Sequence, residues 1–297
     1  MSLQFDQLNN QLKVNDASNA NAPIVLQASG TGAFQAQLAT STSTGGNARG
    51  ANAVDLQTTR TIAAQVASGA NSIIGGGSAN QATGQTATVA GGDTNKANDL
   101  WATVAGGGYN QATAQSATVM GGDDNSATSI GSSVLGGVYG TTRGIIGMQA
   151  SPACNTPISG SQGVSQSSLL ILGRQTTDAT ATILRSNTSA AGTTNQVILP
   201  DNSAYYFKGR IIAGVTGAGN TSAWTFEGAI KRGAGVGTTA IVGTVNTSLV
   251  ARDAGASTWS FTATADTTNG GLAITVTGQA ATTIRWVCKI ETTEMTY

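Results

Sequence analysis

The sequence predicts an all-β, elongated protein with a β-roll stem of 15-residue repeats and a C-terminal antiparallel β-sandwich of jelly-roll type. Three observations indicate this class. A repeat of constant length runs through the middle of the chain, strand-like runs separated by Gly, Asn and Asp clusters fill its C-terminal third, and aromatic residues make up only 5% of the sequence. A chain so poor in aromatic residues builds thin β layers of Ala, Val and Ile more readily than one large core.

The composition excludes several classes of function. The 297 residues include no histidine, and the 14 basic and 14 acidic residues are scattered singly. Without a basic stripe we expect no nucleic-acid partner, and without histidine there is no Ser-His-Asp or Cys-His catalysis within one chain. No apolar run is long enough for a membrane-spanning helix, and the N-terminus lacks the features of a signal peptide. We therefore expect neither membrane insertion nor secretion by a signal peptide.

The stem is expected over residues 61–150, and five consecutive 15-residue units occupy residues 70–144. In the second unit a β-branched residue, Val89, is followed by a Gly pair, then by Asn95 and by the small residue Ala97. The same positions recur in the other units as Ile74, Val104, Val119 and Val134 for the β-branched residue, and as Asn80, Asn110, Asn125 and finally Gly140 for the asparagine.

Side-chain alternation around these positions predicts two short strands in each unit, with positive φ or sharp bends at the Gly pair and at the Asn. Fifteen residues are too few for a strand–helix unit, but they suffice for one coil of a two-stranded roll. A helical interpretation fails because Gly and β-branched residues recur where an amphipathic helix needs long apolar ones. The low charge and high Thr, Ser and Gly content are also typical of disorder, and the regular spacing argues against it.

The strand face opposite to the β-branched row is also apolar. Ala90, Ala105, Met120 and Leu135 lie on it and would face water in a single roll. Because apolar strips of this kind usually mark interfaces, we expect copies of the chain to associate through this face.

Residues 67–137 resemble the head repeats of trimeric autotransporter adhesins, a left-handed β-roll family, and look still more like the versions found in phage tail fibres. The lead-in at residues 46–57 and the runs at residues 204–210, 224–232 and 283–287 are similar to parts of such phage fibres. The resemblance implies an elongated trimeric fibre, with the chain as a homotrimer. Bacterial adhesins of this family need a signal peptide and a C-terminal set of outer-membrane strands; neither is recognisable here, which favours the phage version.

Four regions are expected: a virion-attachment region at residues 1–60, the stem at 61–150, a connector at 151–200, and a receptor-facing β-sandwich at 201–297. Strands of the sandwich are predicted at 205–215, 223–231, 239–250, 258–265, 272–277 and 283–292. Alternation in the last strand directs Cys288 into the core. Cys154 and Cys288 are interpreted as two free buried thiols, and Trp224, Phe226, Trp259 and Phe261 as core residues.

Receptor contact is expected in loops at the distal end of the sandwich, because loops on a rigid scaffold commonly carry function. The candidate residues in these loops are Gly217, Asn220, Arg232, Gly235, Asp266 and Asn269. No catalytic, cofactor-binding or metal-binding residue is predicted. The turn carboxylates Asp93, Asp123 and Asp124 are interpreted as turn caps and not as calcium ligands.

The leading hypothesis is a phage virion structural protein, a tail fibre or tailspike that binds a host surface polysaccharide or an outer-membrane receptor. It would reside in the virion after assembly in the host cytoplasm. Its N-terminal region would bind other virion proteins, either a tail adaptor or nozzle or the capsid. The chain is expected to be no enzyme and to need no cofactor.

One alternative is a capsid head fibre or decoration protein. A second alternative is a polysaccharide-degrading tailspike, which would require a pair of carboxylates. The sparse carboxylates disfavour this function, and Glu227 and Glu291 are interpreted as solvated charges on strand faces.

Overall fold

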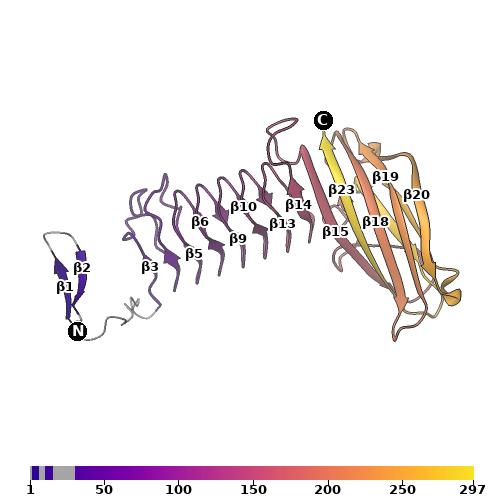
Figure 1. Ribbon diagram of the computed structural model, residues 1–297, viewed down its shortest axis with the longest axis horizontal. Helices are drawn as coiled ribbons and strands as arrows, with labels where there is room; N and C mark the ends of the chain where they lie inside the picture. Colours follow the sequence, from indigo (N-terminus) through magenta and orange to yellow (C-terminus); the bar gives the residue numbers. More distant parts are fainter. Residues whose placement is uncertain (1, 7–10, 16–30) are drawn as a thin grey trace.

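The computed structural model of the chain describes residues 2–6, 11–15 and 31–297, and shows a stem of stacked coils that leads into a two-layered β domain (Figure 1). Part of the expected attachment region, residues 1, 7–10 and 16–30, lies outside the described residues. Strands β1 (Ser2–Asp6) and β2 (Gln11–Asn15) pair as an antiparallel hairpin. The only helical elements among the described residues are two 3-10 turns, Val236–Thr238 and Ala254–Ala256. The predicted all-β class is therefore confirmed.

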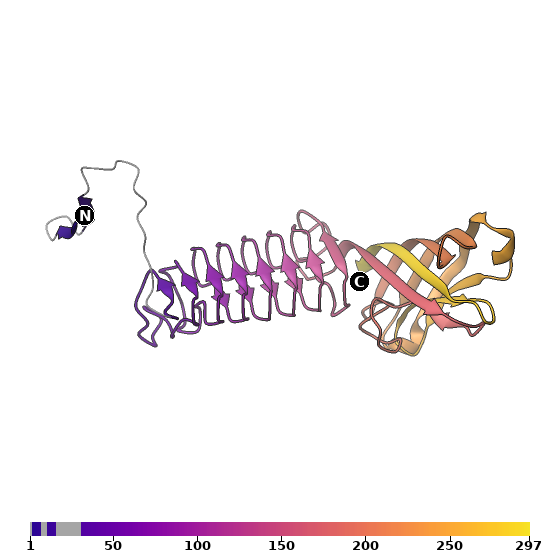
Figure 2. The same cartoon turned by 90° about the horizontal axis from the view of Figure 1, so that it is seen from below.

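The stem consists of two parallel ladders of very short strands, which Figure 2 shows as two rows of arrows. Val89 pairs in register with Val104, and Ala97 pairs with Ala112, so each coil advances the chain by one strand in both ladders. This confirms the two-stranded roll that the repeat predicts. The first ladder contains β3 (Phe34–Gln35), β4 (Val54–Asp55), β5 (Ile73–Ile74), β7 (Thr88–Val89), β9 (Thr103–Val104), β11 (Thr118–Val119), β13 (Ser133–Val134) and β14 (Gln149–Pro152). The second contains β6 (Gln81–Ala82), β8 (Lys96–Ala97), β10 (Gln111–Ala112) and β12 (Ser126–Ala127).

The first ladder begins at β3, ahead of the five regular units and within the range expected to serve attachment. The coils there are longer and irregular, so their period does not stand out in the sequence. A buried ion cluster closes this end of the stem: the Asp55 carboxylate lies 2.8 Å from Arg49 Nε and 3.1 Å from Arg60 Nη2. The cluster pairs its buried charges within itself, which limits the cost of removing them from water.

The asparagines of the repeat have a different role from the one expected. Their side chains are fully buried, and each joins neighbouring coils. Asn95 Nδ2 donates to the carbonyls of Gly91 (2.9 Å) and Gly107 (2.8 Å), and its Oδ1 accepts from the N–H of Asn110 (3.0 Å).

The expectation of a turn conformation at the asparagine is wrong, because the positive φ falls on the residue before it, as at Thr94 (φ 56), and on the second glycine, as at Gly92 (φ 90). The turn directs backbone carbonyls and N–H groups into the roll. These groups need polar partners there, and the Asn amide supplies both a donor and an acceptor.

The C-terminal domain continues the first ladder and adds a second layer. Beyond β14 the sheet runs in the order β15, β23, β18, β19, β20, all antiparallel, so stem and tip share one 13-stranded sheet. The strands of this layer are β15 (Ser165–Thr176), β18 (Ser203–Val215), β19 (Thr221–Arg232), β20 (Ala240–Arg252) and β23 (Ile284–Thr296). The second layer contains β16 (Thr182–Ile183), β17 (Val197–Ile198), β21 (Ser260–Asp266) and β22 (Gly271–Thr277). Residues 165–200, expected to form a connector, thus contribute three strands to the sandwich.

Aromatic residues fill the space between the two layers. The rings of Trp224 and Trp286 stack with centroids 5.8 Å apart, and Trp259 lies 6.0 Å from Trp286. The predicted core positions of Trp224, Phe226 and Trp259 are confirmed, and Phe261 packs at the margin of this cluster.

The two cysteines differ in exposure. Cys288 is buried as predicted, and burial raises the pKa of its thiol to about 12. The prediction for Cys154 is wrong, because this thiol lies exposed in the loop between β14 and β15. Its segment carries no alternating apolar residues that would draw it into a core.

A buried polar network fastens the last stem coil to the sandwich. Glu294 on β23 accepts hydrogen bonds from Arg143 Nη2 (2.9 Å), Gln166 Nε2 (2.9 Å) and Ser168 Oγ (2.5 Å). The guanidinium of Arg143 also lies over the ring of Tyr205. Because Arg143 lies at the end of the last repeat, this network holds stem and tip together.

Candidate functional site on the C-terminal sheet

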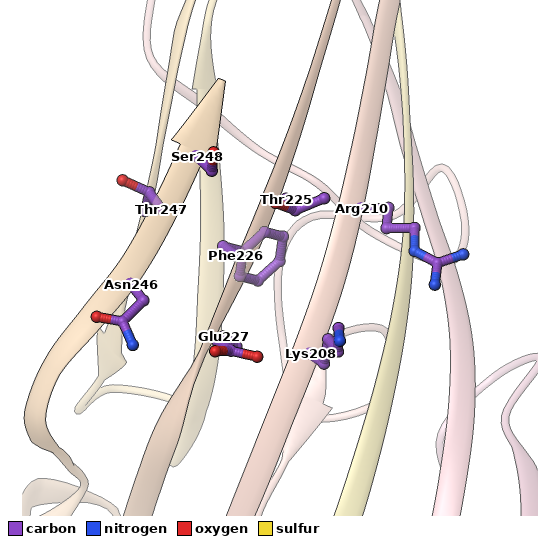
Figure 3. Close-up of a pocket in the computed structure, with 8 residues that line it drawn as sticks. All are labelled: Lys208, Arg210, Thr225, Phe226, Glu227, Asn246, Thr247 and Ser248. Atoms are coloured by element: carbon purple, nitrogen blue, oxygen red, sulfur yellow. The ribbon is translucent and has the colours of Figure 1, made fainter. Parts of the chain in front are cut away.

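The outer face of β18, β19 and β20 carries an open groove of about 350 Å³ (Figure 3). Strand alternation directs Phe207 and Ile211 into the core and leaves Lys208 and Arg210 outside. The neighbouring strands add Thr225 and Glu227 from β19, and Asn246 and Ser248 from β20. Register shifts at Ala223/Trp224 and at Glu227/Ala229 disturb the pairing of β19 with β20. Bulges of this kind often accompany binding sites, because they redirect side chains.

Charges of both signs alternate across this face. Lys208 lies opposite Glu227 on one side and opposite Glu291 on the other. Tyr206 donates a hydrogen bond from its hydroxyl to Glu227 Oε2 (2.8 Å), which raises the pKa of the tyrosine. Lys289 Nζ lies 2.5 Å from Glu291 Oε1, and this contact lowers the pKa of the glutamate. Within the described part of the chain, Lys208 and Arg210 form no ion pair, so their donors are available to a ligand.

This arrangement has the chemistry for binding saccharides. Ammonium, guanidinium, amide and hydroxyl groups offer donors and acceptors to sugar hydroxyls, and Tyr206 adds a half-exposed ring. The two glutamates lie two strands apart, which separates their backbones by about 10 Å. Inverting glycosidases hold their two carboxyl groups roughly 6.5–9.5 Å apart and need no histidine.

The six residues predicted for receptor contact do not form one surface. Gly217 and Asn220 lie in the β18–β19 turn, next to the Ala254–Ala256 turn. Arg232 and Gly235 follow β19 at the opposite end of the strands, and the Asp266–Asn269 turn joins them there, since a Cβ at Gly270 would lie 2.6 Å from Arg232 Nη1. Successive turns of an antiparallel sheet alternate between its two ends. The strands also run across the long axis, so β20 lies with its adjoining connections at the end away from the stem (Figure 1).

The groove residues Lys208 and Arg210 were not among the predicted site residues. Their only signal in the sequence is alternation, because both stand on the polar side of a strand that is otherwise apolar every second residue. Nothing local indicates that Glu227 and Glu291 lie on either side of Lys208.

The described residues hold no group of three or more Cys, Asp or Glu side chains that could bind a metal ion. In the same part of the chain, no helix has the length and apolar character to span a membrane.

The described architecture defines an elongated all-β protein with a roll stem and a sandwich tip. No protein-family profile matches the chain, and no curated protein matches its sequence. Among solved structures, the tailspike protein of Acinetobacter baumannii bacteriophage Fri1, named a capsular polysaccharide depolymerase, aligns at 9% identity and TM-score 0.26, over 81% of this chain and 44% of that one.

Two further tailspikes align at similar levels. The tailspike of Acinetobacter baumannii phage AM24 aligns at 13% identity and TM-score 0.23, over 90% of this chain and 46% of that one. The tailspike of Acinetobacter phage vB_ApiP_P1 aligns at 11% identity and TM-score 0.21, over 76% of this chain and 51% of that one. The chain spans about half the length of these tailspikes.

The expected β-roll architecture is confirmed by the two parallel ladders of the stem, and the aligned structures are phage tailspikes, as the resemblance implied. The expectation that the chain is not an enzyme is wrong by this comparison, because the aligned tailspikes include a polysaccharide depolymerase. The absence of histidine excludes only histidine-dependent chemistry. Glycoside hydrolysis relies on paired carboxylic acids, and the outer face of the tip holds two glutamates.

Proposed function

We propose that the chain is a phage virion fibre protein, a tail fibre or tailspike, whose tip binds the host cell surface. The observation that carries this proposal is the change along one continuous sheet. The outer face of the stem strands bears small or apolar residues without charge, whereas the same face in the tip bears Tyr206, Lys208, Arg210, Glu227 and Glu291. A neutral strip suits association of copies, and a charged face with free donors suits a polar ligand.

Three copies would associate through the outer face of the stem. Ile73, Met120 and Leu135 are 42%, 58% and 49% exposed in a single chain, and Ala90 and Ala105 extend the strip between them. Strands of two residues around an Ala and Val interior bury little apolar area, so the stem gains from covering this strip. The number three follows the resemblance to trimeric fibres. The N-terminal region would attach the trimer to a tail adaptor or nozzle, and the protein would then reside in the virion.

Light scattering of the purified chain and labelling of host cells with fluorescent protein test this proposal together. We expect a trimeric mass and saturable labelling, with labelling reduced at least tenfold by Lys208→Glu combined with Arg210→Glu. The matched control is Lys96→Glu, which reverses a charge on the stem. A trimer that ignores host cells and binds empty capsids would favour a capsid decoration protein, and a monomer would contradict the fibre.

The second candidate function is cleavage of the host polysaccharide at the same face. The specific observation is the placement of Glu227 and Glu291 on either side of Lys208, with Tyr206 bonded to Glu227. One glutamate would act as general acid and the other as general base on water. Release of reducing ends from host polysaccharide measures this activity, and each Glu→Gln variant should lower it by about 10²–10⁴-fold. Unchanged release by both variants would place the activity elsewhere, and Asp178→Asn serves as the control.

A further inference from the structure

A second concave site lies where the stem meets the sandwich. It is a cleft of about 420 Å³ that lies between three parts of the chain: the end of the last repeat, which contributes Arg143; the end of β19 and the turn after it, which contribute Arg232 and Val236; and the second layer with its turns, which contributes Ile198, Pro200 and Asn269. Clefts at the junction of two structural units are common ligand sites, and this volume falls within the usual range of small-molecule pockets. Its lining comes from the side opposite to the apolar stem strip, so association of copies through that strip leaves the cleft open.

Two arginines are held rigidly at this cleft. Arg232 donates from Nη1 to the carbonyl of Leu199 (2.5 Å), and its Nη2 lies 2.6 Å from Asp201 Oδ1. Its Nε is buried and has no hydrogen-bond partner among the described residues. Arg143 engages Glu294 through Nε (3.2 Å) and Nη2 (2.9 Å). These contacts hold both guanidinium groups in place at the wall of the cleft.

The charges around the cleft are already compensated. Asp201 pairs with Arg232, Glu294 pairs with Arg143, and Asp266 adds a further carboxylate that accepts from Asn269 Nδ2 (2.7 Å). Each arginine of the lining is thus paired with a carboxylate that lies outside the lining, so the cleft has no excess of positive charge for an anionic ligand. Ile198, Pro200 and Val236 supply an apolar wall beside these donors. An apolar wall beside fixed N–H donors complements a pyranose, which has a C–H face and a hydroxyl edge.

We propose that this cleft is a second saccharide subsite, which binds a neutral sugar residue bearing hydroxyl or acetamido acceptors, separate from the charged outer face of the tip. The inference rests on the proposed contact with host-surface polysaccharide. It assigns Arg232 and Asn269 to one subsite and adds Arg143, which the stem contributes.

Gly270 makes the position of Arg232 possible. It has φ +77, and a Cβ there would lie 2.6 Å from Arg232 Nη1 and 2.9 Å from Val236 Cγ1. Gly270→Ala therefore displaces the Arg232 side chain from the cleft. Gly217 offers a matched control, because it has φ +80 in the turn at the other end of the strands and its Cβ would meet nothing within 4 Å. Both variants carry the same backbone strain, and only one of them disturbs the cleft.

The test is titration of the full chain with methyl glucoside, N-acetylglucosamine and glucuronate. Calorimetry or ligand-observed NMR measures the binding of each sugar. We expect weak saturable binding of a neutral sugar in preference to glucuronate. Binding should fall at least tenfold in Arg232→Gln and in Gly270→Ala, and persist in Gly217→Ala. Arg232→Lys should lack sugar binding as well, because a lysine ammonium group cannot reproduce the fixed, planar set of N–H donors of a guanidinium group. Thermal unfolding of each variant verifies that the tip remains folded.

Absence of saturable binding by both neutral sugars would overturn the subsite, and so would binding that survives Arg232→Gln and Gly270→Ala. Preference for glucuronate would contradict the charge balance on which the ligand class depends. Host-cell labelling is scored separately: a chain that labels cells but binds no neutral sugar refutes only the subsite, whereas a chain that binds sugar but ignores cells refutes only the proposed fibre function.

Discussion

The stem and the tip share one continuous sheet, yet different interactions stabilise them. In the stem each strand before β14 has two residues, the interior contains Ala and Val, and a row of asparagines links the coils. In the tip the main strands have 12 or 13 residues and enclose a cluster of tryptophan and phenylalanine rings. The stem therefore depends on contacts between neighbouring coils, as repeat proteins do, while the tip depends on a conventional core.

This difference determines where each region tolerates change. The stem repeats one interaction many times, so a single defect is local but interrupts the stack. The tip concentrates its buried area in a few large side chains, so one substitution reaches the whole domain.

The largest effect is expected for Trp286→Ala in the tip. The indole stacks on Trp224 and donates from Nε1 to Thr176 Oγ1 (3.0 Å) in the buried core. Its removal should lower the free energy of unfolding of the tip by about 3–5 kcal/mol. Chemical denaturation followed by tryptophan fluorescence measures this change, and a loss below 1 kcal/mol would contradict the importance of the aromatic core.

A smaller loss is expected for Asn110→Ala in the middle of the stem. Its amide nitrogen donates to the carbonyls of Gly106 (2.9 Å) and Gly122 (2.8 Å), and its amide oxygen accepts from the N–H of Asn125 (3.0 Å). The variant leaves buried polar groups without partners, at about 1–3 kcal/mol for each group that water cannot reach. The control is Asn98→Ala, an exposed asparagine of the same coils. Hydrogen exchange resolves the stem from the tip, and equal protection in both variants would refute the asparagine ladder as a stabilising element.

A change in assembly with little change in the fold is expected for Met120→Lys. The side chain lies on the exposed strip of the stem, and an ammonium group there would be buried between copies without a partner. Gln111→Lys on the second ladder is the control. Light scattering should show monomers for the first variant and the wild-type mass for the second; retention of the wild-type mass by Met120→Lys would exclude this strip as the interface.

The smallest effect concerns thiol reactivity. At pH 8 an alkylating reagent should modify Cys154 in the native chain and spare Cys288, because burial raises the Cys288 pKa to about 12 and keeps this thiol protonated until the pH approaches that value. In denaturant the second thiol should react as well. Mass spectrometry counts the adducts, and two adducts on the native chain would mean that the core around Cys288 opens.

Most of the stem could be predicted from the sequence, because equal coils require equal spacing and the period is visible in Val89, Val104 and Val119. The inward position of Cys288 was predictable for a similar reason, since strand alternation is local. The role of the asparagines was not, because Asn is typical of turns and only the stacked coils reveal which of its neighbours takes the positive φ. The sequence also did not predict that β15 belongs to the tip sheet, because its partner strand β23 follows more than a hundred residues later.

The candidate sites show the same division. The sequence predicted that loops of the tip would contact the receptor, and it named Arg232 and Asn269 without a reason to associate them. The structure brings both to one cleft with Arg143, and it brings Glu227, Lys208 and Glu291 together on one face. Each set combines residues from distant segments of the chain, so no local sequence pattern predicts it.

By itself the sequence determined the all-β class, the 15-residue coil and the polar or apolar side of each strand, because these properties depend on residues two to fifteen positions apart. Only the tertiary structure decided that the stem ladder continues into the tip sheet, that the loops divide between two ends, and that a cleft forms at their junction. These features depend on which distant strands pair, and strand pairing is set by packing of the whole domain.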